Sequence, residues 1–212
     1  MDIEDRIIDC VKDKEVLEIG GLGEFLWYEK KQFKSWRHAR IKSLTKTLTG
    51  IDINSEYVDR AKANGFNYKT ADIENRRSLG NMGRFDVILF IDVIEHLNNV
   101  MAALKNIRIL LRDGGILVMT TPNPYAFNNI FRIFTGRPPG DYYDHTCAFM
   151  RSHMEVLFTR ADMRVRNAEY VSFVDPRAAY RFKSKIISLA GRIKPILNTH
   201  LFIISSMTGE ND

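Results

Sequence analysis

Short apolar segments that alternate with segments of helical period are the feature that most constrains how this chain folds. Seven segments of strand length are predicted strands: Glu15–Ile19, Leu48–Ile53, Tyr68–Ala71, Phe85–Ile91, Ile116–Thr120, Arg164–Ser172 and His200–Ser206. Most are apolar throughout rather than alternately apolar and polar, which is typical of strands buried on both faces. The sequence therefore favours a mostly parallel sheet.

The segments between these strands repeat apolar side chains at helical spacing. The predicted helices are Ile3–Lys12, Ser55–Ala63, Asn99–Leu111 and Met154–Ala161, with Ser55 placed at the start of the second helix. Regular alternation of strands and helices predicts an α/β fold with a doubly wound, Rossmann-like sheet flanked by helices. Ligands of such sheets bind beyond the carboxyl ends of the strands.

Composition is that of one soluble domain spanning residues 1–212. The chain has 212 residues, of which 45% are hydrophobic and 27% charged, and its net charge is +5. The charged N-terminal segment does not resemble a signal peptide. Two separated cysteines, Cys10 and Cys147, form neither a disulfide framework nor a metal site. We expect a cytoplasmic protein without a metal ion.

A cluster of glycines follows the first predicted strand in the stretch VLEIGGLGEF, which contains Glu18, Gly20, Gly21 and Gly23. Glycines at this position let a ligand approach the backbone closely. A simple turn after the strand would use the same residues. The residues at the ends of the neighbouring strands are therefore needed to distinguish a ligand-binding turn from a simple turn.

Acidic residues occur at the ends of three consecutive predicted strands. Asp52 and Asp72 close the second and third strands, and Glu18 lies near the end of the first. A carboxylate after the second strand is the usual ligand of a ribose diol. Glu18 would repel the pyrophosphate of a dinucleotide, but it would attract the sulfonium and ammonium groups of S-adenosylmethionine. A helix cap or a solvated turn explains each acid alone better than a ligand does, but it explains all three acids at matching strand ends much less well.

With these residues, the chain resembles class I S-adenosylmethionine-dependent methyltransferases over nearly its whole length. The resemblance also rests on the stretches FDVILFIDVIEHLNN and LLRDGGILVMTTPNPYAF, which are most similar to the small-molecule branch that methylates quinone rings and sugars. It implies a seven-stranded sheet with an antiparallel last strand. It also implies a cofactor site made of Glu18, Gly20, Gly21, Gly23, Asp52, Ile53, Asp72, Ile73, Phe90 and Ile91.

Two features depart from the family pattern. The glycine turn is one residue shorter than usual, so Gly21 and Gly23 take the places of the later glycines. Glu18 and Asp52 are also separated by far more than the roughly 20 residues typical of this unit. We place a helix at about Ser35–Thr45, with Trp36, Ile41 and Leu44 buried, and a long loop at Leu26–Lys34.

Histidine is the commonest general base for a hydroxyl acceptor, and His145 is the candidate here. It lies after the fifth strand in GDYYDHTCAF, where Asp144 is a candidate to orient its ring. A helix-capping or surface histidine explains His145 equally well. His96 and His38 are interpreted as packing or hydrogen-bonding residues. The predicted substrate-pocket residues are Asn123, Tyr125, Tyr142 and Tyr143, although aromatic packing in the core explains the tyrosines as well.

The expected acceptor is a small molecule, a glycan or a lipid-linked group, methylated on oxygen. Nucleic acid is disfavoured, because TPNP follows the fifth strand and not the fourth, where base-amine methyltransferases hold their base. A basic, amphipathic segment is predicted at 175–196, before the last strand. Such a helix either packs on the core with a solvated basic face or rests on an anionic membrane surface.

Two other functions stay open on the sequence alone. A methyltransferase-fold protein without activity, acting as a binding or scaffold subunit, is consistent with the shortened glycine turn. A nicotinamide-dependent oxidoreductase is disfavoured by Glu18 and by the lack of a clean G-x-G-x-x-G motif.

Overall fold

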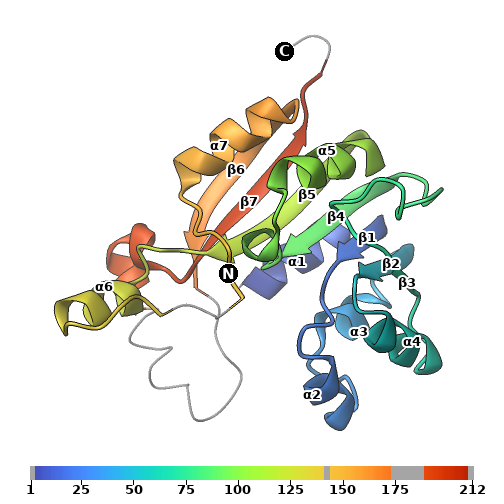
Figure 1. The fold of residues 1–212 in the computed structure, drawn as a ribbon, viewed down its shortest axis with the longest axis horizontal. Coiled ribbons are helices and arrows are strands. Elements are labelled where there is room, and N and C mark those ends of the chain that lie inside the picture. Colours follow the sequence, from blue (N-terminus) through green and yellow to red (C-terminus); the bar gives the residue numbers. More distant parts are fainter. Residues whose placement is uncertain (1–2, 141–143, 173–188, 210–212) are drawn as a thin grey trace.

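The computed structural model describes residues 3–140, 144–172 and 189–209. A seven-stranded sheet runs through them in the order β3-β2-β1-β4-β5-β7-β6 (Figure 1). The strands are β1 (Glu15–Ile19), β2 (Thr47–Asp52), β3 (Tyr68–Thr70), β4 (Phe85–Ile91), β5 (Leu111–Pro122), β6 (Met163–Val171) and β7 (His200–Met207). All seven predicted strands are confirmed with small shifts of their ends, except that β5 begins at Leu111 and not at Ile116.

The pairing of the strands is the one predicted. Strands β1, β2, β3, β4 and β5 pair in parallel with their neighbours, whereas β7 is antiparallel to both β5 and β6. The chain winds outward from β1 to β3 and then returns to place β4 on the other side of β1. The carboxyl ends of β1 and β4 therefore form the switch point at which ligands of doubly wound sheets bind.

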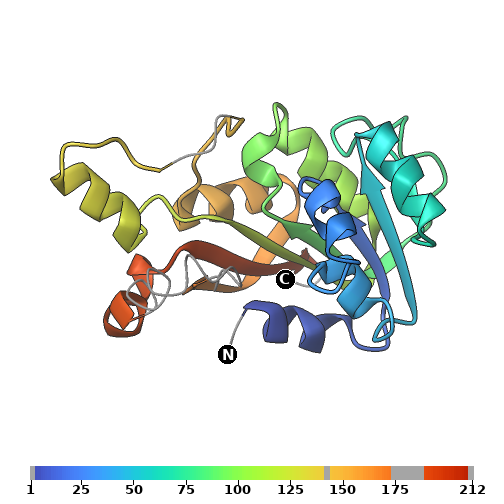
Figure 2. The ribbon, with the colours of Figure 1, turned by 90° about the horizontal axis from the view of Figure 1, so that it is seen from below.

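Helices cover both faces of the sheet (Figure 2). They are α1 (Ile3–Val11), α2 (Phe25–Lys30), α3 (Arg37–Ile41), α4 (Ser55–Ala63), α5 (Val100–Leu110), α6 (Phe127–Phe134) and α7 (Arg151–Arg160), with short 3₁₀ turns η1 (Ile94–His96) and η3 (Pro195–Leu197). Alternate residues of the central strands face opposite layers. Ile88 and Phe90 pack with α5 and α7, while Val87 and Leu89 pack with α1.

A third core cluster lies beyond the sheet and corrects the predicted loop at Leu26–Lys34. Much of that segment is helix α2, because Phe25 packs edge-to-face on Trp36 and also contacts Phe33. Such tertiary aromatic contacts stabilise a helix that is too short for its own sequence to show an apolar period. The helix predicted at Ser35–Thr45 is the shorter α3; Trp36 and Ile41 are buried as predicted, and Leu44 is partly exposed.

Several other details differ from the sequence prediction. The side chain that caps α4 belongs to Asn54 and not to Ser55, since its oxygen accepts a hydrogen bond from the Tyr57 N–H. Helix α6 was not predicted, and it projects from the body of the molecule. Tyr142, Tyr143 and most of the basic segment 175–196 lie outside the described residues; residues 189–193 of that segment are helical.

Candidate active site

The glycine turn after β1 has the conformation that only glycine adopts readily. Gly20 and Gly21 have φ angles of +77° and +92°, a region that costs other residues free energy. A Cβ atom on Gly20 would lie 2.8 Å from the side chain of Val93, which follows β4. The turn is thus a bare stretch of backbone packed against the end of the neighbouring strand, at the switch point of the sheet.

A buried network supports this turn from below. The Tyr68 hydroxyl donates to Oε2 of Glu18 at 2.9 Å, and Nδ1 of His38 lies 2.7 Å from the same oxygen. The indole N–H of Trp36 donates to the carbonyl oxygen of Gly21 at 2.9 Å. Glu18, His38, Tyr68 and Trp36 are each at most 2% exposed. The segment between β1 and β2 therefore fixes the path of the glycine turn.

The charge state of Glu18 follows from these contacts. Burial opposes its ionisation, but the hydrogen bonds and charges of His38, Arg37 and Tyr68 outweigh burial and hold the pKa of Glu18 below its ordinary value. The Nη1 atom of Arg37 lies 3.6 Å from Oε1 of Glu18. A negative charge therefore sits directly under the glycine turn.

The structure places the other two predicted acids along the same edge of the sheet. Asp52 ends β2, is partly buried, and accepts a hydrogen bond from the Asn54 N–H at 3.0 Å. Burial raises the pKa of Asp52, and backbone N–H groups of Asn54 and Leu22 oppose that shift. Asp72 follows β3 and accepts from the Glu74 N–H at 2.8 Å. The three acids thus lie at or near the carboxyl ends of three adjacent strands, as predicted.

The apolar residues predicted to contact the cofactor differ in their exposure. Ile53 is 73% exposed, whereas Ile73, Phe90 and Ile91 belong to the buried core. The core residues therefore contribute packing beneath the site, and Ile53 is the apolar side chain that extends from its rim.

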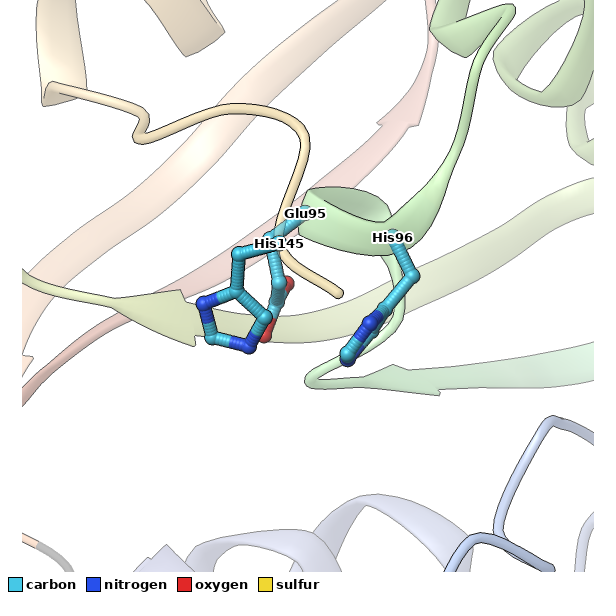
Figure 3. Close-up of side chains that lie close together, drawn as sticks. All are labelled: Glu95, His96 and His145. Atoms are coloured by element: carbon cyan, nitrogen blue, oxygen red, sulfur yellow. The ribbon is translucent and has the colours of Figure 1, made fainter. Parts of the chain in front are cut away.

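A second cluster of polar side chains follows β4. Asp92 has a positive φ of 53°, and Oδ1 of its carboxylate accepts from the Thr120 hydroxyl at 2.7 Å. Turn η1 then presents Glu95 and His96. Figure 3 shows their side chains beside that of His145, which comes from the loop before α7. The rings of His96 and His145 meet edge-to-face with centroids 4.7 Å apart.

Backbone contacts of Thr146 explain why these side chains meet. Its N–H and its hydroxyl both donate to the carbonyl oxygen of Glu95, at 2.7 and 3.0 Å, and the hydroxyl also lies 2.9 Å from the carbonyl of Leu97. The loop that carries His145 is thereby tied to η1. Asp144 lies in the same loop, and its Oδ2 is 3.2 Å from Nδ1 of His96. An orienting role of Asp144 toward the His145 ring stays a prediction.

Glu95 is the most perturbed acid of this cluster. It is 1% exposed, and burial together with the nearby charges of Asp92 and Asp144 raises its pKa to about 8. Its Oε2 accepts from the Thr121 hydroxyl at 3.1 Å. Within the described part of the chain, its buried Oε1 has no hydrogen-bond partner. An unsatisfied buried carboxylate oxygen is costly and often marks a functional site.

The predicted substrate-pocket residues divide into two kinds. Asn123 is buried, and its amide donates to the backbone carbonyls of Ile196 and Asn198 at 2.7 and 2.6 Å. It therefore anchors the segment before β7. Tyr125 is 41% exposed, and its hydroxyl contacts the sulfur of Met150. A substrate role for either residue stays a prediction.

Comparison with known proteins agrees with this geometry. The sequence pattern of a family described as "Methyltransferase domain" matches residues 3–179. The chain belongs to this methyltransferase family. The family membership supports S-adenosylmethionine as the cofactor, as the sequence predicts. It does not select the small-molecule branch.

Individual relatives place the domain in varied proteins. The chain is 34% identical over 133 residues to the non-reducing polyketide synthase ausA of Emericella nidulans, covering 59% of this chain but 5% of that protein. A solved SAM-dependent methyltransferase of Archaeoglobus fulgidus has a TM-score of 0.63 at 20% identity, with 95% and 90% of the two chains covered. Magnesium protoporphyrin IX methyltransferase of Synechocystis, solved with bound SAH, has a TM-score of 0.61 at 11% identity, with 97% and 82% covered.

Sequence reasoning missed Glu95 and Asp92 as site residues. The available signal was the stretch IDVIEH directly after the fourth strand, which places two acids and a histidine at the switch point. Only the fold shows that His145 joins them, because the loop that carries it is distant in sequence.

Proposed function

We propose that this protein is an S-adenosylmethionine-dependent O-methyltransferase whose acceptor is a hydroxyl group of a small molecule, a glycan or a lipid-linked compound. The observation that carries the proposal is the pairing of two sites at one switch point. A glycine turn over a buried carboxylate follows β1, and a histidine-rich polar cluster follows β4.

The residues around the glycine turn suit a cationic nucleoside ligand. The turn leaves backbone groups accessible, Glu18 supplies negative charge beneath them, and Asp52 offers a carboxylate for two ribose hydroxyls. Asp72 and Ile53 would complete the adenosine end. When bound, S-adenosylmethionine supplies a methyl group to which the acceptor oxygen bonds as the carbon–sulfur bond breaks, with the electron pair passing to sulfur and the hydroxyl proton leaving.

The polar cluster after β4 supplies the groups that an acceptor hydroxyl needs. A general base or another device that stabilises the alkoxide speeds transfer to oxygen. His145 is the predicted base, and its neighbours Glu95 and His96 give the hydroxyl further polar partners. These residues would orient the acceptor oxygen and accept its proton, while alignment with the methyl group supplies much of the rate.

A lipid-linked acceptor is supported by an exposed apolar surface on α6. Phe131, Ile133 and Phe134 are 60%, 57% and 86% exposed. Figures 1 and 2 both draw residues 189–193, which include the exposed Arg192, at the same end of the molecule as α6. Exposed aromatic residues with nearby cations favour contact with an anionic lipid surface. Among the described helices, none is long and apolar enough to span a bilayer.

Cofactor binding is the first test. Calorimetry with S-adenosylhomocysteine should show one site per chain, and NADH should show none. Transfer of a radiolabelled methyl group would then be measured to simple phenols, sugars and prenylated phenols, the last in detergent or vesicles. Binding of NADH but not of S-adenosylhomocysteine would contradict the proposal.

The same methyl-transfer assay distinguishes the proposed enzyme from the second candidate, a scaffold protein. A scaffold protein without activity would bind S-adenosylhomocysteine or nothing, and would transfer no methyl group to any acceptor class. Transfer that disappears in an Asp52→Ala variant but persists in an Asp59→Ala variant would assign the activity to this site, since Asp59 lies exposed on α4.

A further inference from the structure

The cluster of Glu95, His96 and His145 has the geometry of a metal-binding site. Each residue offers one ligand atom, and the three atoms lie within 4.8 Å of one another. Two ligands of one ion are separated by about 3–4 Å when each is about 2.1 Å from the metal. The three ligand atoms therefore need to move together by only a small distance to bind one ion. Figure 3 shows them converging from η1 and from the loop before α7.

The groups that contact the cluster are also arranged as they are around bound metal ions. Nδ1 of His96 lies 3.2 Å from the Asp144 carboxylate, which orients the ring and leaves ligation to Nε2. A histidine ligand typically donates its other ring N–H to such a carboxylate. The Thr121 hydroxyl holds Oε2 of Glu95, while the buried Oε1 has no hydrogen-bond partner among the described residues.

The electrostatics favour a cation at this position. The Asp144 carboxylate contacts the ring of His96, and Asp92 precedes Glu95 by three residues at the end of β4, so two further acidic groups border the cluster. Burying a carboxylate beside two others is unfavourable unless an opposite charge compensates. A bound cation would supply that charge and would satisfy Oε1 of Glu95.

We propose that Glu95, His96 and His145 bind one divalent ion of the first transition row, with open coordination positions facing the acceptor site. Two imidazoles and one carboxylate are donors that suit Zn²⁺, Co²⁺, Fe²⁺ and Mn²⁺ better than Mg²⁺, which prefers oxygen ligands. Three protein ligands leave positions for water or for a substrate oxygen, as in catalytic metal sites.

The role of the ion rests on the proposed function, but its binding does not. A metal-bound hydroxyl loses its proton more easily, and the ion also orients the acceptor oxygen. His145 would then act as a ligand and not as the general base predicted from sequence. The two roles differ in an observable way, because a base does not require a metal.

The test uses the full chain without a histidine tag, stripped of metal by a chelator. Calorimetry and visible absorption with Co²⁺ should show one equivalent bound by nitrogen and oxygen ligands. Glu95→Gln and His145→Gln should each weaken binding by more than about 100-fold, and Asp144→Asn by about 10- to 100-fold. His153→Gln is the matched control, since His153 is exposed on α7.

Several results would overturn the proposal. One is the absence of Co²⁺, Zn²⁺ and Mn²⁺ binding at millimolar concentration; another is binding that Glu95→Gln and His145→Gln leave unchanged. Folding is checked by thermal unfolding of each variant in metal-free buffer. If Glu95→Gln fails to fold, His145→Gln still decides the question, because its loop is partly exposed. Separate titration with S-adenosylhomocysteine shows whether a failure concerns the metal site alone or the proposed function.

Discussion

Nδ1 of His38 lies 2.7 Å from Oε2 of Glu18, and both residues are 1% exposed. Their backbones belong to α3 and β1, so this single contact joins the inserted segment to the strand that ends in the glycine turn. The Tyr68 hydroxyl shares the same carboxylate oxygen. The stability of the fold and the path of the glycine turn consequently depend on one buried network.

Removing His38 should destabilise the protein strongly. His38→Leu keeps most of the volume but leaves the Glu18 carboxylate buried with fewer partners, and we expect a loss of about 3 kcal/mol in the free energy of unfolding. Urea unfolding measures this loss. The control is His153→Leu on the exposed face of α7, which loses one long hydrogen bond from the Met150 N–H (3.4 Å) and should change stability by less than about 1 kcal/mol. Equal losses for the two variants would mean that the buried contact contributes little.

The lowered pKa of Glu18 predicts how this contribution depends on pH. A group whose pKa is lower in the folded state stabilises the protein above its unfolded pKa, which is about 4.3 for glutamate. The contribution is lost as the pH falls through the folded pKa. The difference in stability between wild type and Glu18→Gln should therefore shrink as the pH falls from neutral to about 3. A difference that stays constant over this range would contradict the assignment.

The Trp36–Gly21 hydrogen bond should couple the inserted segment to cofactor affinity. Trp36→Phe keeps an aromatic ring in the cluster but removes the N–H that holds the Gly21 carbonyl. We expect a loss of about 2 kcal/mol in stability and a severalfold weaker affinity for S-adenosylhomocysteine. Trp27→Phe is the control, since Trp27 is partly exposed and stacks edge-to-face on Tyr28. If both variants bind alike, the turn does not depend on this hydrogen bond.

Asp52 should contribute directly to cofactor affinity. Its carboxylate ends β2 beside the glycine turn, and a hydrogen bond to a charged group contributes about 1.5–3 kcal/mol. Asp52→Ala should thus weaken binding of S-adenosylhomocysteine by about 10- to 150-fold. Calorimetry measures the change, with Asp59→Ala on α4 as the control. Unchanged affinity of Asp52→Ala would remove Asp52 from the ribose role.

Much of the fold was predictable because its signal is local. Nearly continuous apolar runs such as Phe85–Ile91 are typical of strands buried on both faces, and their alternation with helices indicates the class of the sheet. Helix α2 was not predictable in this way. The charged residues around it favour a loop, and the packing of Phe25 on Trp36 becomes visible only when the chain is folded.

The site was predictable to the extent that strand ends define it. Asp52 and Asp72 could be placed at one edge because they follow consecutive parallel strands. The contact of His145 with Glu95 and His96 could not, because it depends on hydrogen bonds from Thr146 to the backbone of η1. No pattern in the sequence indicates that the loop with His145 packs against η1. His96 by itself was interpreted as a structural residue.

The exposed face of α6 should bind anionic vesicles if the acceptor is lipid-linked. Phe134 is the most exposed apolar residue of this helix, and burying a phenylalanine side chain contributes about 1.5–3 kcal/mol. Phe134→Ser should therefore lower the partition coefficient of the protein onto phosphatidylglycerol vesicles by about tenfold. The fraction of protein that sediments with the vesicles measures this coefficient. Val156→Ser on α7, where Val156 is 50% exposed, is the control. Sedimentation without vesicles reports self-association. Vesicle binding that is absent, or equal for both variants, would exclude α6 as a membrane contact and favour a soluble acceptor.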